Sequence, residues 1–189
     1  MLQGGYKQSF LNRKKSAAAF FFCFVVLAAL LSQDARAGAG PDWIYNQKYN
    51  FWLRKPPQWE QSAGPLGGDQ AEQLIDPSRN AFVEVYASSI PEKVTLQYIA
   101  DNWEAKAREK NIAYLQKRIS SQDRKIKGVP AILRIYEGTA AGAAFKSYIL
   151  FFYEKEMAYV VIGVFPKSLS GRYENLVKKA VLSFRLIEP

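Results

Sequence analysis

Two long apolar segments in the C-terminal half of the chain place the strongest constraint on its fold. Residues 145–153 and 158–165 are strongly apolar and are separated by the short polar segment 154–157. A tight polar turn between two such segments predicts an antiparallel β-hairpin. Because the second segment is apolar almost throughout, it indicates a central strand that is covered on both faces.

Weaker patterns predict further strands in the rest of the chain. In 42–55, aromatic and β-branched runs flank a short polar segment, which indicates a second hairpin that ends at Pro56 and Pro57. Residues 81–87 alternate in the manner of a strand with one buried face. We also expect strands at 73–76, 113–120 and 129–137, of which the second is polar and close to a sheet edge.

Two segments, 95–110 and 169–184, carry the spacing of amphipathic helices. Thr95 is the expected N-cap of the first helix, and Ser168 or Ser170 is the expected N-cap of the second. Strands that are segregated from helices along the chain indicate the α+β class with a mainly antiparallel sheet.

The N-terminal stretch, residues 1–37, has the three parts of a bacterial-type secretory signal peptide. Residues 13–15 are basic, residues 17–31 form an apolar run, and Ala35 and Ala37 are the small residues of the expected cleavage site. We therefore predict that the protein is exported and cleaved after Ala37.

Cleavage would leave a flexible lead-in, residues 38–42, and a single α+β domain, residues 43–189, in the periplasm. The alternative is an uncleaved helix that anchors the domain to the membrane, because the apolar run approaches the length that a spanning helix needs. The part after residue 37 carries 21 basic and 16 acidic residues, a net charge of +5.

The chemistry available to the mature domain is narrow, because the chain has no histidine and its single cysteine, Cys23, lies in the predicted signal peptide. These facts exclude Ser-His-Asp and Cys-His catalysis and the usual zinc sites. We expect no cofactor, no metal and no enzyme activity. A carboxylate-based hydrolase is the alternative, but we expect carboxylates such as Asp101 and Glu104 to be surface charges.

Basic residues cluster between positions 106 and 127. The cluster can contact anionic lipid head groups or an acidic protein, and it can equally be a solvated helix end and edge strand. Nucleic acid is not an expected partner, since the protein is exported and Tyr114 alone is interleaved as a stacking aromatic. The candidate contact residues are Lys106, Arg108, Lys110, Lys117, Arg118, Arg124, Lys125 and Lys127.

The aromatic segment 43–59, which contains three tryptophans, allows two interpretations. Its rings can line a ligand groove, or they can belong to the core. We favour the core, because most large aromatic side chains in a domain of this size are buried.

Part of the same segment, residues 49–59, resembles the opening signature of PsbP-like domains, in which an aromatic strand runs into proline and tryptophan. Residues 128–131 (Gly-Val-Pro-Ala) resemble the glycine-led third strand of that family. The family usually has glycine where this chain has Asn50 and Gln58. Since asparagine tolerates a positive φ and glutamine does so poorly, we expect the turn before Trp59 to differ.

The resemblance implies an α/β/α sandwich with a central, mainly antiparallel sheet. It also implies an exported, non-enzymatic accessory or binding protein, and it brings no catalytic residue. We therefore expect an accessory or protein-binding module of the bacterial envelope whose partner is another envelope protein or complex. The alternative is a membrane-surface protein held by the N-terminal helix or by the basic cluster.

Overall fold

The computed structural model describes residues 42–62, 69–90 and 93–187. The chain divides into two units, residues 1–38 and 39–189, and every described residue belongs to the second. The predicted signal peptide, with Ala35 and Ala37, lies outside the described residues, so its cleavage stays a prediction.

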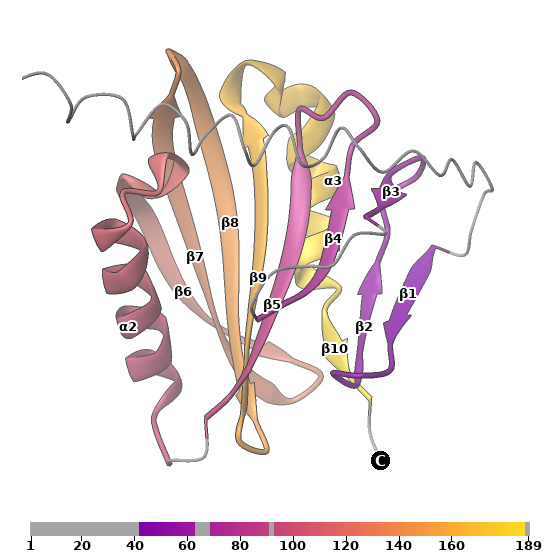
Figure 1. Ribbon diagram of the computed structural model, residues 1–189, viewed down its shortest axis with the longest axis vertical. Helices are drawn as coiled ribbons and strands as arrows, with labels where there is room; N and C mark the ends of the chain where they lie inside the picture. Colours follow the sequence, from indigo (N-terminus) through magenta and orange to yellow (C-terminus); the bar gives the residue numbers. More distant parts are fainter. Residues whose placement is uncertain (1–41, 63–68, 91–92, 188–189) are drawn as a thin grey trace, which may run out of the picture. The chain divides into compact units, whose positions relative to one another are not determined.

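A seven-stranded antiparallel sheet forms the centre of the domain, with the strand order β3-β4-β5-β9-β8-β7-β6 (Figure 1). The predicted central strand is confirmed, because β9 lies between β5 and β8 and is buried from Ala158 to Phe165. The strands are β3 (Glu60–Gln61), β4 (Gln70–Ile75), β5 (Phe82–Ser89), β6 (Lys117–Ile126), β7 (Val129–Ala140), β8 (Ala143–Glu154) and β9 (Met157–Pro166).

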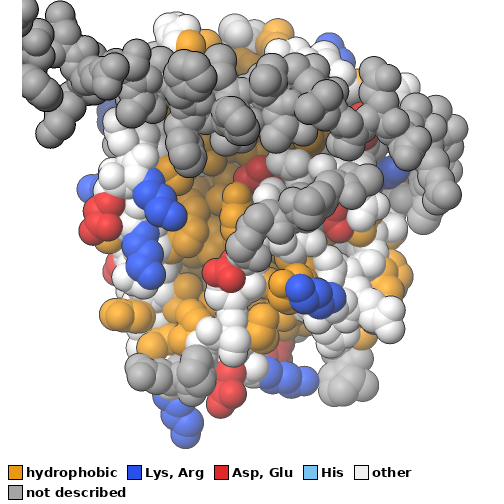
Figure 2. Space-filling model, in the orientation of Figure 1, with side chains coloured by type: hydrophobic (Ala, Val, Ile, Leu, Met, Phe, Trp, Pro, Cys, Tyr) orange, Lys and Arg blue, Asp and Glu red, His pale blue; other side chains and the backbone are white. Residues whose placement is uncertain are grey.

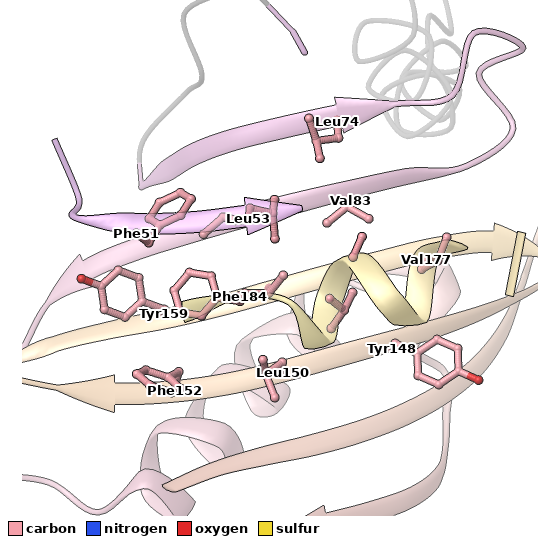
Figure 3. Packing of buried hydrophobic residues seen from close by; sticks show 14 of the residues in the cluster. Phe51, Leu53, Leu74, Val83, Tyr148, Leu150, Phe152, Tyr159, Val177 and Phe184 are labelled. Carbon is pink, nitrogen blue, oxygen red and sulfur yellow. The ribbon is translucent and has the colours of Figure 1, made fainter. Parts of the chain in front are cut away.

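One side of this sheet is covered by α3 (Ser170–Leu182), whose apolar stripe packs onto β8 and β9. Figure 3 shows Val177 of this helix within the cluster of buried side chains on that side. Gly163 of β9 permits the close approach, since a Cβ atom there would lie 2.3 Å from Val177 Cγ1 and 2.8 Å from Val181 Cγ2. The backbone of β9 at Gly163 therefore lies in close contact with side chains of α3.

The opposite side of the sheet is covered in part by α2 (Leu96–Glu109), as Figure 1 shows. Trp103 meets the ring of Phe151 edge-on, with centroids 5.5 Å apart. The predicted N-cap is confirmed, because the Thr95 side chain accepts a hydrogen bond from the Tyr98 backbone N–H at 3.1 Å. Helices on both sides of one antiparallel sheet make the predicted α/β/α sandwich.

A second, three-stranded sheet pairs the predicted N-terminal hairpin with the end of the chain. β2 (Phe51–Arg54) lies between β1 (Trp43–Asn46) and β10 (Arg185–Leu186). β10 is too short to show a strand pattern in the sequence. It is held in an extended conformation by its pairing with β2. The inward side chain of Phe51 packs on Phe184, with ring centroids 5.2 Å apart, so this sheet is attached to the α3 side of the core.

Three hairpins of the large sheet, β6–β7, β7–β8 and β8–β9, close in two residues each. Both central residues have a positive φ at Lys127 and Gly128 (48° and 89°), and at Lys155 and Glu156 (51° and 62°). The same holds at residues 141 and 142 (48° and 80°), between the predicted strands 129–137 and 145–153. Such turns match the twist of the flanking strands, so β7 and β8 extend further than predicted.

Two local predictions are wrong. Residues 113–115 form a 3₁₀ helix, η1 (Ala113–Leu115), and the expected edge strand begins only at Lys117. The backbone of η1 lies against Gly138, where a Cβ atom would come within 2.0 Å of the Ala113 carbonyl oxygen. At the start of α3, the N-cap is Leu169 without a side-chain hydrogen bond, because the Ser170 hydroxyl donates to the Lys167 carbonyl instead.

The expectation of a different turn before Trp59 is also wrong. Asn50 and Gln58 have φ values of 55° and 66°, which is the left-handed conformation that glycine would adopt. The Trp59 N–H donates to the Pro56 carbonyl at 3.2 Å, so Gln58 occupies the glycine position of a type II turn. The backbone keeps this conformation without the glycine and carries the strain.

Candidate functional site

The structure places the predicted basic cluster on α2 and on the edge strand β6. All eight of its side chains are exposed. Acidic side chains lie among the basic ones over α2, as Figure 2 shows on this face of the domain. The cluster is therefore a mixed surface rather than a uniformly positive one.

Glu104 organises much of this region, although it was expected on the surface. The residue is 6% exposed, and its carboxylate lies 2.9 Å from the Arg118 guanidinium and 2.8 Å from that of Arg134. Arg108 also pairs with it, and Tyr136 donates a hydrogen bond to it at 2.8 Å. The expectation fails because Glu104 faces the sheet, where a buried arginine offers it a partner.

Arg134 of β7 is that partner, and its side chain is fully buried. One terminal nitrogen donates to Glu104 Oε2 at 2.8 Å and to the Ala100 carbonyl at 3.0 Å, and the other binds Asp101. Asp101 and Glu104 thus both bind Arg134 and join α2 to the sheet. We call this group the Glu104 network.

The pKa of Glu104 records the balance of forces in this network. Burial alone would raise that pKa, but the hydrogen bond from Tyr136 and the neighbouring guanidinium groups hold it below the ordinary value of 4.5. The carboxylate is therefore charged at neutral pH. Arg108 and Arg118 pair with this carboxylate, so their charges are already partly neutralised within the domain.

Of the six remaining basic residues of the cluster, Lys117, Arg124 and Lys125 lie on β6, which is an edge strand of the sheet. Charged side chains on such an edge hinder pairing with another chain. Arg124 donates a hydrogen bond to Gln122 of the same strand. Protection of the edge therefore accounts for part of this charge without a partner.

A different surface combines aromatic and basic side chains, and its ion pair between Arg54 and Asp42 is loose, with an N–O distance of 3.8 Å. In the three-stranded sheet, Ile44, Phe51 and Leu53 point into the core. The alternate positions therefore point outward. We call this outer side the aromatic–basic face, and it consists of Trp43, Tyr45, Trp52, Arg54 and Arg185.

The rings on this face lie against their neighbours. Tyr45 and Trp52 are stacked, with centroids 4.9 Å apart and an interplanar angle of 27°. The Arg185 guanidinium lies over the Trp43 ring, 4.2 Å from its centroid. The two tryptophans are half-buried, and Tyr45 is 46% exposed. The face is therefore ordered in advance of any contact.

Two hollows flank the face, and basic residues line both. One, of about 470 Å³, lies between the β1–β2 hairpin and the C-terminal half of α3. The other, of about 250 Å³, brings Lys127 beside Trp52 and Arg185. Among the described residues, those that line the two hollows include no carboxylate. We call the first the α3 groove, and its lining residues are Trp43, Arg54, Asn175, Lys178, Lys179, Leu182 and Ser183.

The aromatic segment 43–59 is divided between the core and the surface, so the core interpretation is confirmed for part of it and a ligand groove stays a prediction for the rest. Trp59 and Phe51 are core residues, with exposures of 3% and 0%. Trp43 and Trp52 belong to the outer face. The alternation within the two short strands was the signal that could have separated these groups, because neighbouring residues of a strand face opposite sides.

Two buried carboxylates, Glu72 and Glu84, are not among the residues that line the hollows. Burial raises the pKa of Glu84, which accepts hydrogen bonds from Gln73 at 2.8 Å and Tyr86 at 3.0 Å. Burial likewise raises the pKa of Glu72, which is 4% exposed and is bonded by Gln61. In the described part of the chain, no three His, Cys, Asp or Glu side chains are grouped to hold a metal ion.

The arrangement of elements matches solved structures. The solution structure of cyanobacterial PsbP (CyanoP) from Synechocystis sp. PCC 6803 aligns with a TM-score of 0.62 and 13% identity, over 84% of this chain and 99% of that one. The domain has a PsbP-like fold. No protein-family model and no curated protein matches the sequence.

Two other proteins share the PsbP-like fold. The Ran-binding protein Mog1p of Saccharomyces cerevisiae aligns at a TM-score of 0.56 and 11% identity, over 80% of this chain and 97% of that one. LpqN of Mycobacterium tuberculosis, described as involved in cell envelope biogenesis, aligns at 0.57 and 8%, over 77% and 90%. At these identities the likeness establishes the fold alone.

Neither helix of the described residues has the length and apolar character that crossing a membrane requires. The predicted anchor, residues 17–31, lies outside them. The choice between a cleaved and a retained N-terminal helix therefore rests on the sequence.

Proposed function

We propose that the protein is an exported, non-catalytic accessory module of the bacterial envelope that binds another protein through its aromatic–basic face. The observation that carries the proposal is the composition of that face, which displays two tryptophans, a tyrosine and two arginines on the outer side of a small sheet. These residue types are enriched at protein interfaces and dominate their binding energy. Side chains that are already ordered lose little entropy on binding.

The comparisons support the proposal without deciding it. One protein with this fold is named as Ran-binding and another as involved in cell envelope biogenesis. A fold hosts unrelated functions, so the argument depends on the surface and not on the neighbours. The proposed location in the envelope rests on the predicted signal peptide.

Site-specific photo-cross-linking tests the surface in cells. A photoreactive phenylalanine at Tyr45 should give a discrete adduct with an envelope protein, because this ring is 46% exposed at the centre of the face. Tyr98 of α2 is the matched control, since it is 58% exposed but belongs to the other side of the domain. Adducts from Tyr98 alone would refute the proposed surface.

A second candidate function is contact with an anionic membrane surface through the basic cluster. The observation in its favour is that Lys106, Lys110, Lys117 and Lys125 are exposed outside the Glu104 network. Co-sedimentation with phosphatidylglycerol vesicles tests it. Charge reversal at Lys117 and Lys125 should abolish sedimentation if this surface binds the membrane.

The N-terminus of the protein isolated from the envelope fraction tests export and cleavage together. Intact-mass measurement should give a chain that begins at Gly38, which follows the predicted cleavage residue Ala37. A chain that retains residues 17–31 would show that the signal is not cleaved and would favour the membrane-anchored alternative.

A further inference from the structure

We infer that the α3 groove binds an acidic segment of the partner protein, in which carboxylates flank one large apolar side chain. This inference rests on the proposed function and adds the chemistry that the partner must offer. It assigns a binding site to the end of α3, which the sequence did not indicate.

The charge of the groove specifies the acidic part of the ligand. Arg54 enters from β2, and Lys178 and Lys179 enter from two successive positions of α3. Asp42 approaches Arg54 at 3.8 Å, and both side chains are more than half exposed. Such a loose, solvated pair is worth little, so an incoming carboxylate can replace it and bind the guanidinium with two hydrogen bonds.

The floor of the groove specifies the apolar part. Trp43 and Leu182 line it, and the volume of about 470 Å³ lies in the range of ligand pockets. Ser183 is already used, because its hydroxyl accepts the Arg54 backbone N–H at 2.8 Å and donates to the Ala180 carbonyl at 2.6 Å. Asn175 thus supplies the amide group that can bond a peptide backbone.

The positive charge continues beyond the groove along the aromatic–basic face. Arg185 lies over Trp43, and together with Trp52 and Lys127 it lines the second hollow. An extended acidic segment can therefore cross the sheet from one hollow to the other and meet cations along its whole path. This continuity favours a chain-like ligand over a single small anion.

The geometry favours a protein over a lipid bilayer. Tryptophans that insert into a membrane interface present the ring to the lipid, whereas Trp43 is covered by Arg185 and Trp52 is stacked on Tyr45. The flat surface of a bilayer also cannot fill a hollow. A peptide side chain can fill it, and backbone groups then remain near Asn175.

Nuclear magnetic resonance titration of the mature chain tests the inference. The probe is a blocked peptide in which glutamates flank one phenylalanine, and the control peptide has glutamine in place of glutamate. We expect the acidic peptide to shift the indole signal of Trp43 and the amide signals of Asn175, while Trp103 on α2 stays unchanged. The control peptide should bind at least about tenfold more weakly, which corresponds to about 1.4 kcal/mol.

Paired charge reversals provide matched variants. Lys178→Glu with Lys179→Glu should lower the affinity for the acidic peptide by at least about tenfold. Lys106→Glu with Lys110→Glu makes the same charge change on α2 and should leave the affinity unaltered. Equal losses in both variants would show non-specific attraction and overturn the inference.

The remaining outcomes separate this inference from the proposed function. Phosphatidylglycerol vesicles that shift Trp43 when the acidic peptide does not would overturn the inference in favour of lipid. A specific adduct at Tyr45 without peptide binding in the groove would leave the proposed function standing and refute the ligand chemistry. Peptide binding in the groove without any adduct at Tyr45 would support the ligand chemistry and refute the proposed function.

Discussion

Arginine side chains serve differently in two regions of the domain, the interface between α2 and β7 and the outer side of the small sheet. In the first, the guanidinium group of Arg134 is fully buried and bonded to Glu104 and Asp101. In the second, Arg54 and Arg185 lie beside aromatic rings and line hollows whose described lining residues include no carboxylate. The first region joins α2 to the sheet, and the second is the surface that we propose contacts a partner.

The difference shows that a run of basic residues in the sequence does not locate a binding surface. The densest run, between residues 106 and 127, supplies two of the three arginines that surround Glu104. The cations of the aromatic–basic face and its hollows come from three distant parts of the chain, at Arg54, at Lys127 and in residues 178–185. The positions of the carboxylates decide which cations remain available.

The largest effect should come from breaking the Glu104 network. Glu104→Ala leaves the Arg134 guanidinium buried without its main partner, and we expect a loss of about 3–5 kcal/mol in the free energy of unfolding. Urea denaturation measures this loss. Glu109→Ala, an exposed change at the end of the same helix, should cost no more than about 0.5 kcal/mol. Equal costs would mean that the network does not hold α2 to the sheet.

Acid should remove most of the contribution of Glu104. Its pKa in the folded protein lies below the unfolded value of 4.5, so the stabilisation is present above that value and is lost as the pH falls through the folded pKa. The gap in stability between the wild type and Glu104→Gln should therefore shrink as the pH falls below about 4.5. Denaturant titrations at several pH values measure the gap, and a constant gap would contradict the assignment.

A change outside both regions calibrates the comparison. Gln58→Gly relieves a left-handed backbone position and should stabilise the domain by about 1 kcal/mol. Asn50→Gly is the matched control and should gain less, because asparagine tolerates this conformation. Thermal denaturation of both variants measures the effect. A gain at Asn50 that exceeds the gain at Gln58 would contradict the account of strain.

The smallest effect is expected on the aromatic–basic face. Arg54→Gln removes an exposed cation whose partner Asp42 is 3.8 Å away, and stability should change by less than about 0.5 kcal/mol. Chemical denaturation tests this value. A loss comparable to that of Glu104→Ala would place Arg54 among the structural arginines and erase the distinction between the two regions.

Most of the architecture could be predicted from the sequence, because local patterns report it directly. The hairpin of β8 and β9 has apolar runs that only a doubly covered strand explains, and α2 has both its stripe and its cap at Thr95. The resemblance in 49–59 also led to the correct fold. What failed locally, such as η1, depends on a tertiary contact with Gly138.

The candidate site was predicted less well, because it depends on which residues meet across the fold. Glu104 looked exposed, since its partner Arg134 lies 30 positions away in the sequence. The α3 groove joins the hairpin of β1 and β2 to the end of α3. No local pattern encodes such a juxtaposition, although strand alternation could have placed Trp43 and Trp52 on the outside.

The pairing of early strands with late ones has a consequence for the order in which the chain can fold. β5 pairs with β9, and β2 pairs with β10 at the end of the chain. Contacts between such distant segments require long loops to close first, which makes folding slow. If the chain emerges with its N-terminus first, the large sheet cannot be completed before β9 has emerged. The small sheet cannot be completed before β10 has emerged. For the exported protein that we propose, this topology delays folding until β9 and β10 have been translocated.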